Sequence, residues 1–247
     1  MGDFCRAGFS RGGVMRNRFF MLKVLYEDNH LIAVIKPAGV LVQGDITGDK
    51  CLMDEVKEYL KEKYNKPGNV FLGLLHRLDR PVSGVILFAK TSKGASRVSD
   101  QIRRHKLEKI YHALVLGVPK NKKDTLINWL EKDENKNFVT VYDEPTAIDL
   151  SAGGKAGDER QYAELDYEVI KSNGKNSILK ITLKTGRSHQ IRSQLSHIGH
   201  PIVGDTKYGA LSSLPDNSIA LCATALTFAT ATGDETKTVA IEPPFTL

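Results

Sequence analysis

The chain is poor in cysteine and in long apolar runs. Its 3 cysteines lie at positions 5, 51 and 222 without any CxxC pair, so neither a disulfide framework nor a zinc ribbon is indicated. No apolar run approaches the roughly 20 residues that span a bilayer, and residues 1–20 lack the apolar core of a secretory signal. These absences favour a reducing, cytoplasmic location and no membrane partner.

Acidic residues are outnumbered by basic ones. Lys and Arg total 35 against 29 Asp and Glu, a formal charge of +6, which favours polyanionic partners. The segment 90–109 contains seven basic and two acidic residues and so carries 7 − 2 = +5. A helix over 91–105 would place Lys93, Arg97 and Arg104 on one face. Such a face suits a phosphate backbone, although many charged helix faces are only solvated.

Hydrophobic residues make up 41% of the 247 positions, enough to build a folded core. The remaining pattern predicts hairpins with few helices. Strands are predicted over 22–26, 31–35, 70–75, 85–89, 110–118, 161–170, 177–184 and 219–230. Helices are predicted over 52–64 and 91–105, and around Ile191, Leu195 and Ile198. Positions 120–124 predict a polar turn and 144–160 a long loop. Together these elements predict one α+β domain, with a mixed, mainly antiparallel sheet and flanking helices.

Two polar blocks interrupt this ordinary pattern. Positions 76–84 read HRLDRPVSG and place Asp79 between two arginines, on a turn before an apolar strand. Positions 184–192 read KTGRSHQIR, and a glycine-rich run over 198–209 follows. Taken without context, Asp79 is a turn residue, an exposed ion-pair partner or a catalytic carboxylate.

The two blocks, with KPAG at 36–39 and KIY at 109–111, resemble the RluA-type RNA pseudouridine synthases in order and separation. The resemblance implies a catalytic domain over 21–247 that isomerises uridine in structured rRNA or tRNA, without a cofactor or a metal. Residues 1–20 are rich in Arg and Gly and predict a flexible basic extension, with Met1, Met15 or Met21 as the start, and this extension is too short for the S4 domain of many relatives. We expect a monomer with no obligatory protein partner.

The resemblance also assigns roles to individual residues. Asp79 matches the catalytic aspartate, a nucleophile towards C1′ or C6 or a base, and Arg192 matches the arginine that keeps it ionised. Tyr111 matches the tyrosine that packs on the target base and has been proposed to help remove the C5 proton, and Arg77 matches the residue that fills the space left by the flipped base. Val82 replaces a common threonine, which removes one possible hydrogen bond. The other predicted substrate-binding residues are Arg187, Lys109, Arg97 and Arg104.

Two other functions remain open at this point. A metal-dependent hydrolase could use His189, His197, His200 and Asp205, although neither an HExxH motif nor a carboxylate pair accompanies them. A non-catalytic RNA-binding or ribosome-assembly protein would share the basic helix but would not need Asp79 together with Arg192.

Overall fold

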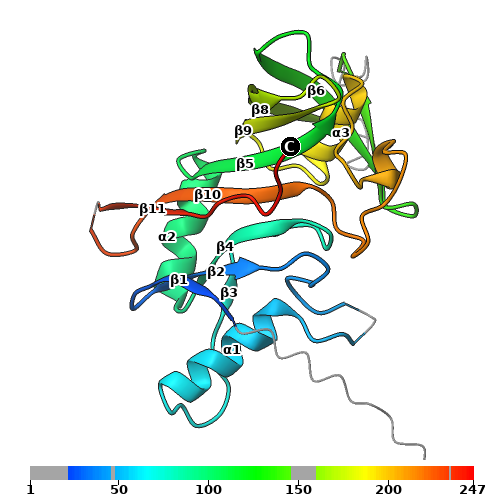
Figure 1. Ribbon diagram of the computed structural model, residues 1–247. Coiled ribbons are helices and arrows are strands. Elements are labelled where there is room, and N and C mark those ends of the chain that lie inside the picture. Colours follow the sequence, from blue (N-terminus) through cyan, green and yellow to red (C-terminus); the bar gives the residue numbers. More distant parts are fainter. Residues whose placement is uncertain (1–21, 46–47, 146–159, 234) are drawn as a thin grey trace, which may run out of the picture.

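One mixed β-sheet with α-helices on both faces forms the protein, as the computed structural model describes it for residues 22–45, 48–145, 160–233 and 235–247 (Figure 1). The strands are β1 (Val24–Glu27), β2 (Leu31–Lys36), β3 (Gly73–Leu74), β4 (Ser83–Ala89), β5 (Glu108–Leu116), β6 (Lys123–Asp133), β7 (Phe138–Tyr142), β8 (Gln161–Ser172), β9 (Asn176–Leu183), β10 (Leu221–Ala229) and β11 (Thr236–Ala240). The helices are α1 (Leu52–Lys63), α2 (Ser92–Arg103) and α3 (Gln190–His197), with a 3₁₀ turn η2 (Thr206–Tyr208).

The strand order brings distant parts of the chain together. It runs β1-β2-β4-β10-β5-β9-β8-β6-β7, with β3 beside β4 and β11 beside β10. Strands β4 and β10 pair in parallel, whereas the other strand pairs are antiparallel. The predicted α+β class with a mainly antiparallel sheet is therefore confirmed.

Helices cover both faces of β2 and β4, which explains why these strands are continuous apolar runs. Alternate residues point to opposite faces of a strand. Ile32 and Val34 accordingly pack in one core with Val56 of α1, whereas Leu31 and Ala33 pack in the other core, which also contains Val98 of α2. The two cores therefore pack against opposite faces of β4.

Several predicted elements differ from the observed ones. The strand predicted over 70–75 is only β3, two residues long, and the polar turn predicted over 120–124 overlaps the first residues of β6. Strands β6, β7 and β11 were not predicted. Of these, β6 alternates Leu126, Asn128 and Leu130 on its buried side, and the central asparagine interrupts the apolar period on which prediction depends.

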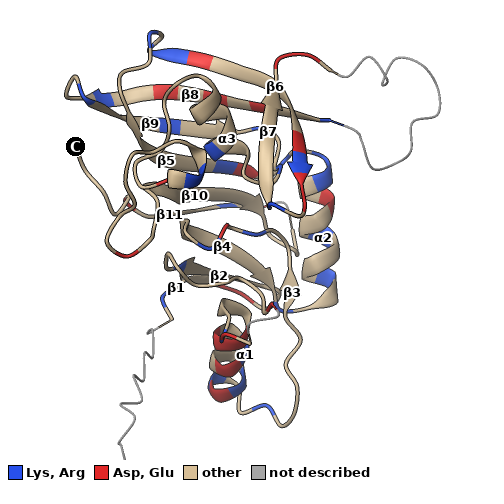
Figure 2. Ribbon diagram, turned by 90° about the vertical axis from the view of Figure 1, so that its right-hand side faces the viewer, with Lys and Arg blue, Asp and Glu red and all other residues tan. Residues whose placement is uncertain are grey.

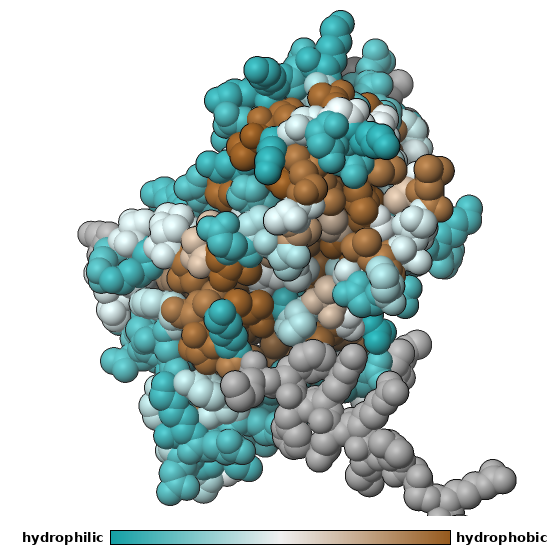
Figure 3. Space-filling view, viewed as in Figure 1, coloured by the Kyte–Doolittle hydropathy of each residue, from teal (hydrophilic) through white to brown (hydrophobic). Residues whose placement is uncertain are grey.

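Charged residues occur along the helices, and α2 in particular carries basic ones (Figure 2). Apolar side chains gather in the middle of the face seen in Figure 3, with hydrophilic ones around them. Among the described helices none is long and apolar enough to cross a membrane. The predicted extension over 1–20 and most of the loop predicted over 144–160 lie outside the described residues.

Candidate active site

Asp79 lies on the loop between β3 and β4. The buried Lys36 binds the backbone of this loop. The Lys36 ammonium donates hydrogen bonds to the carbonyls of Pro37, Arg80 and Val82, at 3.0, 3.1 and 2.6 Å. The backbone N–H of Gly39 also donates to the Arg80 carbonyl, at 2.8 Å. Burial lowers the pKa of Lys36 to about 7. The KPAG motif thus holds the backbone that follows Asp79, at Arg80 and Val82.

Arg192 joins Asp79 to a second carboxylate, Asp205. Its Nη1 donates to Asp79 Oδ2 at 3.0 Å, while Nε and Nη2 donate to the two oxygens of Asp205 at 2.7 and 2.9 Å. The Asp205 side chain is 1% exposed and that of Asp79 is 29% exposed. Burial alone would lower the pKa of Arg192, but Asp205 and Asp79 outweigh burial and raise it. Asp205 therefore fixes the guanidinium, and the exposed edge of Asp79 stays open to a ligand.

His189 and Tyr208 close the same end of the site. His189 Nε2 lies 3.8 Å from Asp79 Oδ2, and its Nδ1 is hydrogen-bonded to the Tyr208 hydroxyl at 2.8 Å. That hydroxyl also accepts the backbone N–H of Val139 at 2.9 Å. Burial lowers the pKa of His189, so the ring is neutral at physiological pH and does not compete with Arg192 for the Asp79 charge.

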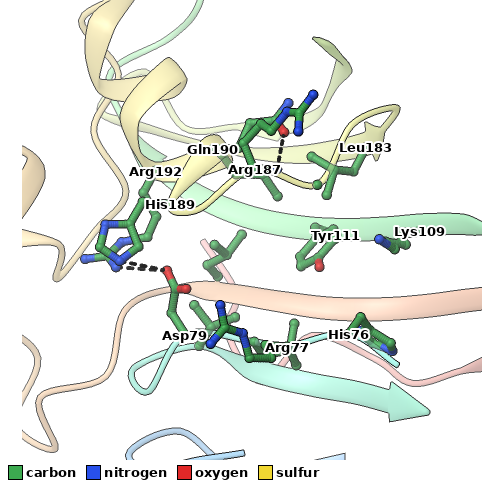
Figure 4. Close-up of a pocket in the computed structure, with 15 residues that line it drawn as sticks. His76, Arg77, Asp79, Lys109, Tyr111, Leu183, Arg187, His189, Gln190 and Arg192 are labelled. Carbon is green, nitrogen blue, oxygen red and sulfur yellow. Dashed lines mark hydrogen bonds and ion pairs between the residues drawn. The ribbon is translucent and has the colours of Figure 1, made fainter. Parts of the chain in front are cut away.

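A pocket of about 110 Å³ opens beside Asp79. Figure 4 shows Asp79, Arg192 and His189 at one end, Lys109 and His76 at the other, and Tyr111 with Arg77 between them. Burial, reinforced by the Asp79 carboxylate, raises the pKa of the Tyr111 hydroxyl, which keeps it protonated. Of the described residues that line the pocket, four are cationic and one is acidic, Asp79. The four cations are Arg77, Lys109, Arg187 and Arg192.

The loop between β9 and α3 carries Arg187 at the rim of the pocket. The side-chain oxygen of Gln190 accepts the backbone N–H of Arg187 at 3.0 Å and the Thr185 hydroxyl at 2.8 Å. Arg187 Nε donates to the Tyr162 carbonyl at 3.0 Å, although the side chain is exposed. A groove of about 700 Å³ continues from this rim and is also lined by Lys132 and Lys207. An anionic polymer in the groove would therefore pass directly over Asp79.

Comparisons with known proteins agree with this geometry. Residues 30–197 match the family model described as RNA pseudouridylate synthase. The chain belongs to the RNA pseudouridylate synthase family. It is 36% identical over 201 residues to the tRNA pseudouridine synthase C of Vibrio parahaemolyticus, covering 76% of this chain and 74% of that one. It is 34% identical over 203 residues to the ribosomal large subunit pseudouridine synthase C of Buchnera aphidicola, covering 79% and 59%. The predicted RluA-type resemblance is confirmed, and with it an isomerase.

A solved structure shares the fold. Human RNA Pseudouridylate Synthase Domain Containing 4 superposes with a TM-score of 0.73 at 22% identity, covering 90% of this chain and 88% of that one. At this identity the likeness supports the architecture alone. It agrees with the single pseudouridine synthase domain predicted from the sequence.

Six of the eight predicted site residues of this pseudouridine synthase line one pocket. They are Asp79, Tyr111, Arg192, Arg77, Arg187 and Lys109. The other two are exposed, Arg97 on α2 and Arg104 as the C-cap of that helix, and they line none of the pockets described above. Arg104 is also paired with Asp100, through its Nε at 2.9 Å. Their role in RNA binding remains a prediction.

The residues proposed for a metal site in the synthase have other partners. His197 Nε2 contacts Asp143 at 2.9 Å, His200 Nδ1 contacts the Leu116 carbonyl at 2.9 Å, and Asp205 is bound to Arg192. Within the described part of the chain, no group of three His, Cys, Asp or Glu side chains could hold a metal ion. The geometry therefore gives the hydrolase alternative no support.

Sequence reasoning missed the structural partners of Asp79 and Arg192 in this synthase. Lys36 was used only as a family signature, and Asp205 only as a possible metal ligand. Their signal was present, since each polar residue stands beside apolar ones in the sequence, at Ile35 and in the run 202–205. A buried charge needs a partner, but the partner's position came only from the fold.

Proposed function

We propose that this synthase isomerises uridine to pseudouridine in structured RNA, after the target nucleotide has been flipped out of its stack and into the Asp79 pocket. The observation that carries the proposal is a partly exposed carboxylate, bound by a buried arginine, at one end of a pocket of about 110 Å³. The names of the two relatives given above support tRNA or large-subunit ribosomal RNA as the substrate class. Reaching a base inside a stack requires flipping, which costs roughly a few kcal/mol.

The reaction is an isomerisation without redox change. The N1–C1′ bond breaks, the C5–C1′ bond forms, the hydrogen on C5 leaves as a proton, and N1 gains a proton. Asp79 begins it by adding to C1′, by adding to C6 or by removing a sugar proton. In each case the uracil ring carries negative charge in the course of the reaction.

Tyr111 and Arg77 have supporting roles in this proposal. The Tyr111 ring stacks on the extruded base, and its protonated hydroxyl relays the C5 proton towards the Asp79 carboxylate. Arg77 is exposed and forms no ion pair with any residue that the structure describes, so it is free to enter the gap left in the RNA stack. Arg187, Lys132 and Lys207 bind phosphates in the adjacent groove.

The test is tritium release from RNA labelled at uracil C5, because forming the C5–C1′ bond expels that hydrogen. The RNA comes from cells that lack the protein and is separated into tRNA and ribosomal RNA. We expect release from one fraction with the wild-type protein. Asp79→Asn should give no release while binding the same RNA. Binding without release by the wild-type protein, in both fractions and in precursor RNA, would instead support a non-catalytic RNA-binding protein.

A further inference from the structure

Lys109 is a half-buried cation with no counter-charge among the residues that the structure describes. It lies on β5, and because side chains two residues apart in a strand share a face, it points to the same side as Tyr111. It forms no ion pair or hydrogen bond with any residue that the structure describes, and burial lowers its pKa. Removing an ammonium group from water is costly unless something pairs with it.

Room for this ammonium group is built into the β9–α3 loop. A Cβ placed at Gly186 would lie 3.4 Å from Lys109 Nζ, so a larger residue there would press on the lysine. The register sets Lys109 opposite Leu183 of β9 and Leu226 of β10, so its strand neighbours are apolar. The fold therefore holds the cation at the pocket wall without neutralising it.

The one carboxylate among the lining residues is already engaged elsewhere. Asp79 is bound by Arg192 at the opposite end of the pocket from Lys109 (Figure 4). The counter-charge for Lys109 must therefore come from the ligand. Phosphates of the RNA are met first by the exposed Arg77 and Arg187 at the rim, whereas the base is the part that enters the pocket.

We propose that the Lys109 ammonium contacts a carbonyl oxygen of the flipped uracil and stabilises the negative charge that develops on the ring when its bond to C1′ is broken or C6 is attacked. This inference rests on the proposed function. It holds for each route open to Asp79, because all of them place charge on the uracil oxygens. A fixed charge aimed at developing negative charge acts on the rate more than on ground-state binding.

The test compares Lys109→Met and Lys109→Arg with the wild-type protein, by single-turnover tritium release at saturating protein and by RNA binding. We expect Lys109→Met to lower the rate constant about 100-fold, the scale for loss of one such group, with RNA affinity changed less than about threefold. The rate constant of Lys109→Arg should be at least tenfold higher than that of Lys109→Met. Lys180→Met is the matched control, since Lys180 is an exposed lysine on β9 outside the pocket.

The outcomes separate the two proposals. If the wild-type protein releases tritium and Asp79→Asn does not, the proposed function stands. An unchanged rate for Lys109→Met would then overturn the inference alone, as would a weaker affinity with an unchanged saturated rate, which marks a phosphate contact. Lys109→Gln, with folding checked by circular dichroism, serves as a second neutral variant.

Discussion

Arg192 holds Asp205 through two hydrogen bonds and Asp79 through one. The buried carboxylate orients the guanidinium through Nε and Nη2, and the partly exposed carboxylate accepts a hydrogen bond from the third nitrogen, Nη1. The two carboxylates thus differ in burial and in their number of bonds to Arg192, which predicts different effects for the two aspartates.

Asp205→Asn should destabilise the fold and reduce activity. The substitution leaves a buried guanidinium with only part of its charge balanced, and breaking a buried ion pair costs about 3–5 kcal/mol. Urea denaturation measures the loss. Asp79→Asn is the control, because Arg192 keeps its buried partner, and we expect its free energy of unfolding within about 1 kcal/mol of the wild type. Equal stability of both variants would contradict this difference.

Lys36→Met should loosen the Asp79 loop. Methionine fills a similar volume but removes the Lys36 hydrogen bonds to the carbonyls of Pro37, Arg80 and Val82, of which Arg80 keeps the Gly39 N–H. We expect faster hydrogen exchange at the Gly39 amide, which bonds to the Arg80 carbonyl, and slower tritium release at saturating protein. Lys61→Met, an exposed change on α1, should alter neither, and unchanged exchange at Gly39 would count against loop support.

His76 should make stability depend on pH in the acid range. Its Nε2 accepts the Leu87 N–H at 3.1 Å, and burial lowers its pKa from 6.5 to about 3. Between pH 6.5 and pH 3, His76 therefore binds a proton in the unfolded chain but not in the folded chain. The contribution of neutral His76 to the free energy of unfolding is fully present above pH 6.5 and is lost as the pH falls towards 3. Between pH 7 and pH 5 this loss is about 2 kcal/mol.

His76→Gln provides the comparison, since glutamine can accept the same backbone N–H without titrating. The free energy of unfolding of this variant should fall less than that of the wild type between pH 7 and pH 5, measured by urea denaturation. Parallel decreases in the two proteins would show that His76 is not the group responsible.

Gly84→Ala should damage the parallel contact between β4 and β10. Gly84 has φ +132°, and a Cβ there would lie 2.4 Å from the Ala223 carbonyl oxygen. Crowding and backbone strain together should cost about 3 kcal/mol. Gly174→Ala is matched to it, with φ +84° and no atom within 4 Å of the added Cβ, and should cost only about 1 kcal/mol. Similar losses at both sites would refute the steric argument.

Arg97→Gln and Arg104→Gln test the basic face of α2. If α2 binds RNA, each phosphate contact removed should reduce the slope of log affinity against log salt by about 1. We expect the larger effect from Arg97, because Arg104 already pairs with Asp100. Filter binding over a salt series measures the slope. Unchanged slopes would identify α2 as a solvated helix face.

The sequence predicted elements whose signal is local. The helix over 91–105 is α2, where the Thr91 hydroxyl accepts the Gly94 N–H at 3.1 Å as an N-cap. The strands predicted over 161–170 and 177–184 form the hairpin β8–β9, whose turn has Gly174 at φ +84°. Strand β11 could not be predicted in this way, because Val239 is its one buried residue and supplies no alternation.

What the sequence by itself determined is the order of the elements and the family motifs, and therefore the residues around Asp79. Only the tertiary structure decided the partners, because they come from segments far apart in the chain. Arg192 is 113 residues from Asp79, and Lys36 is 46 residues from Val82. Sequence periodicity reports which face of an element is buried. Only the tertiary arrangement could show that Arg192 is shared by two carboxylates while Lys109 pairs with none among the residues that the structure describes.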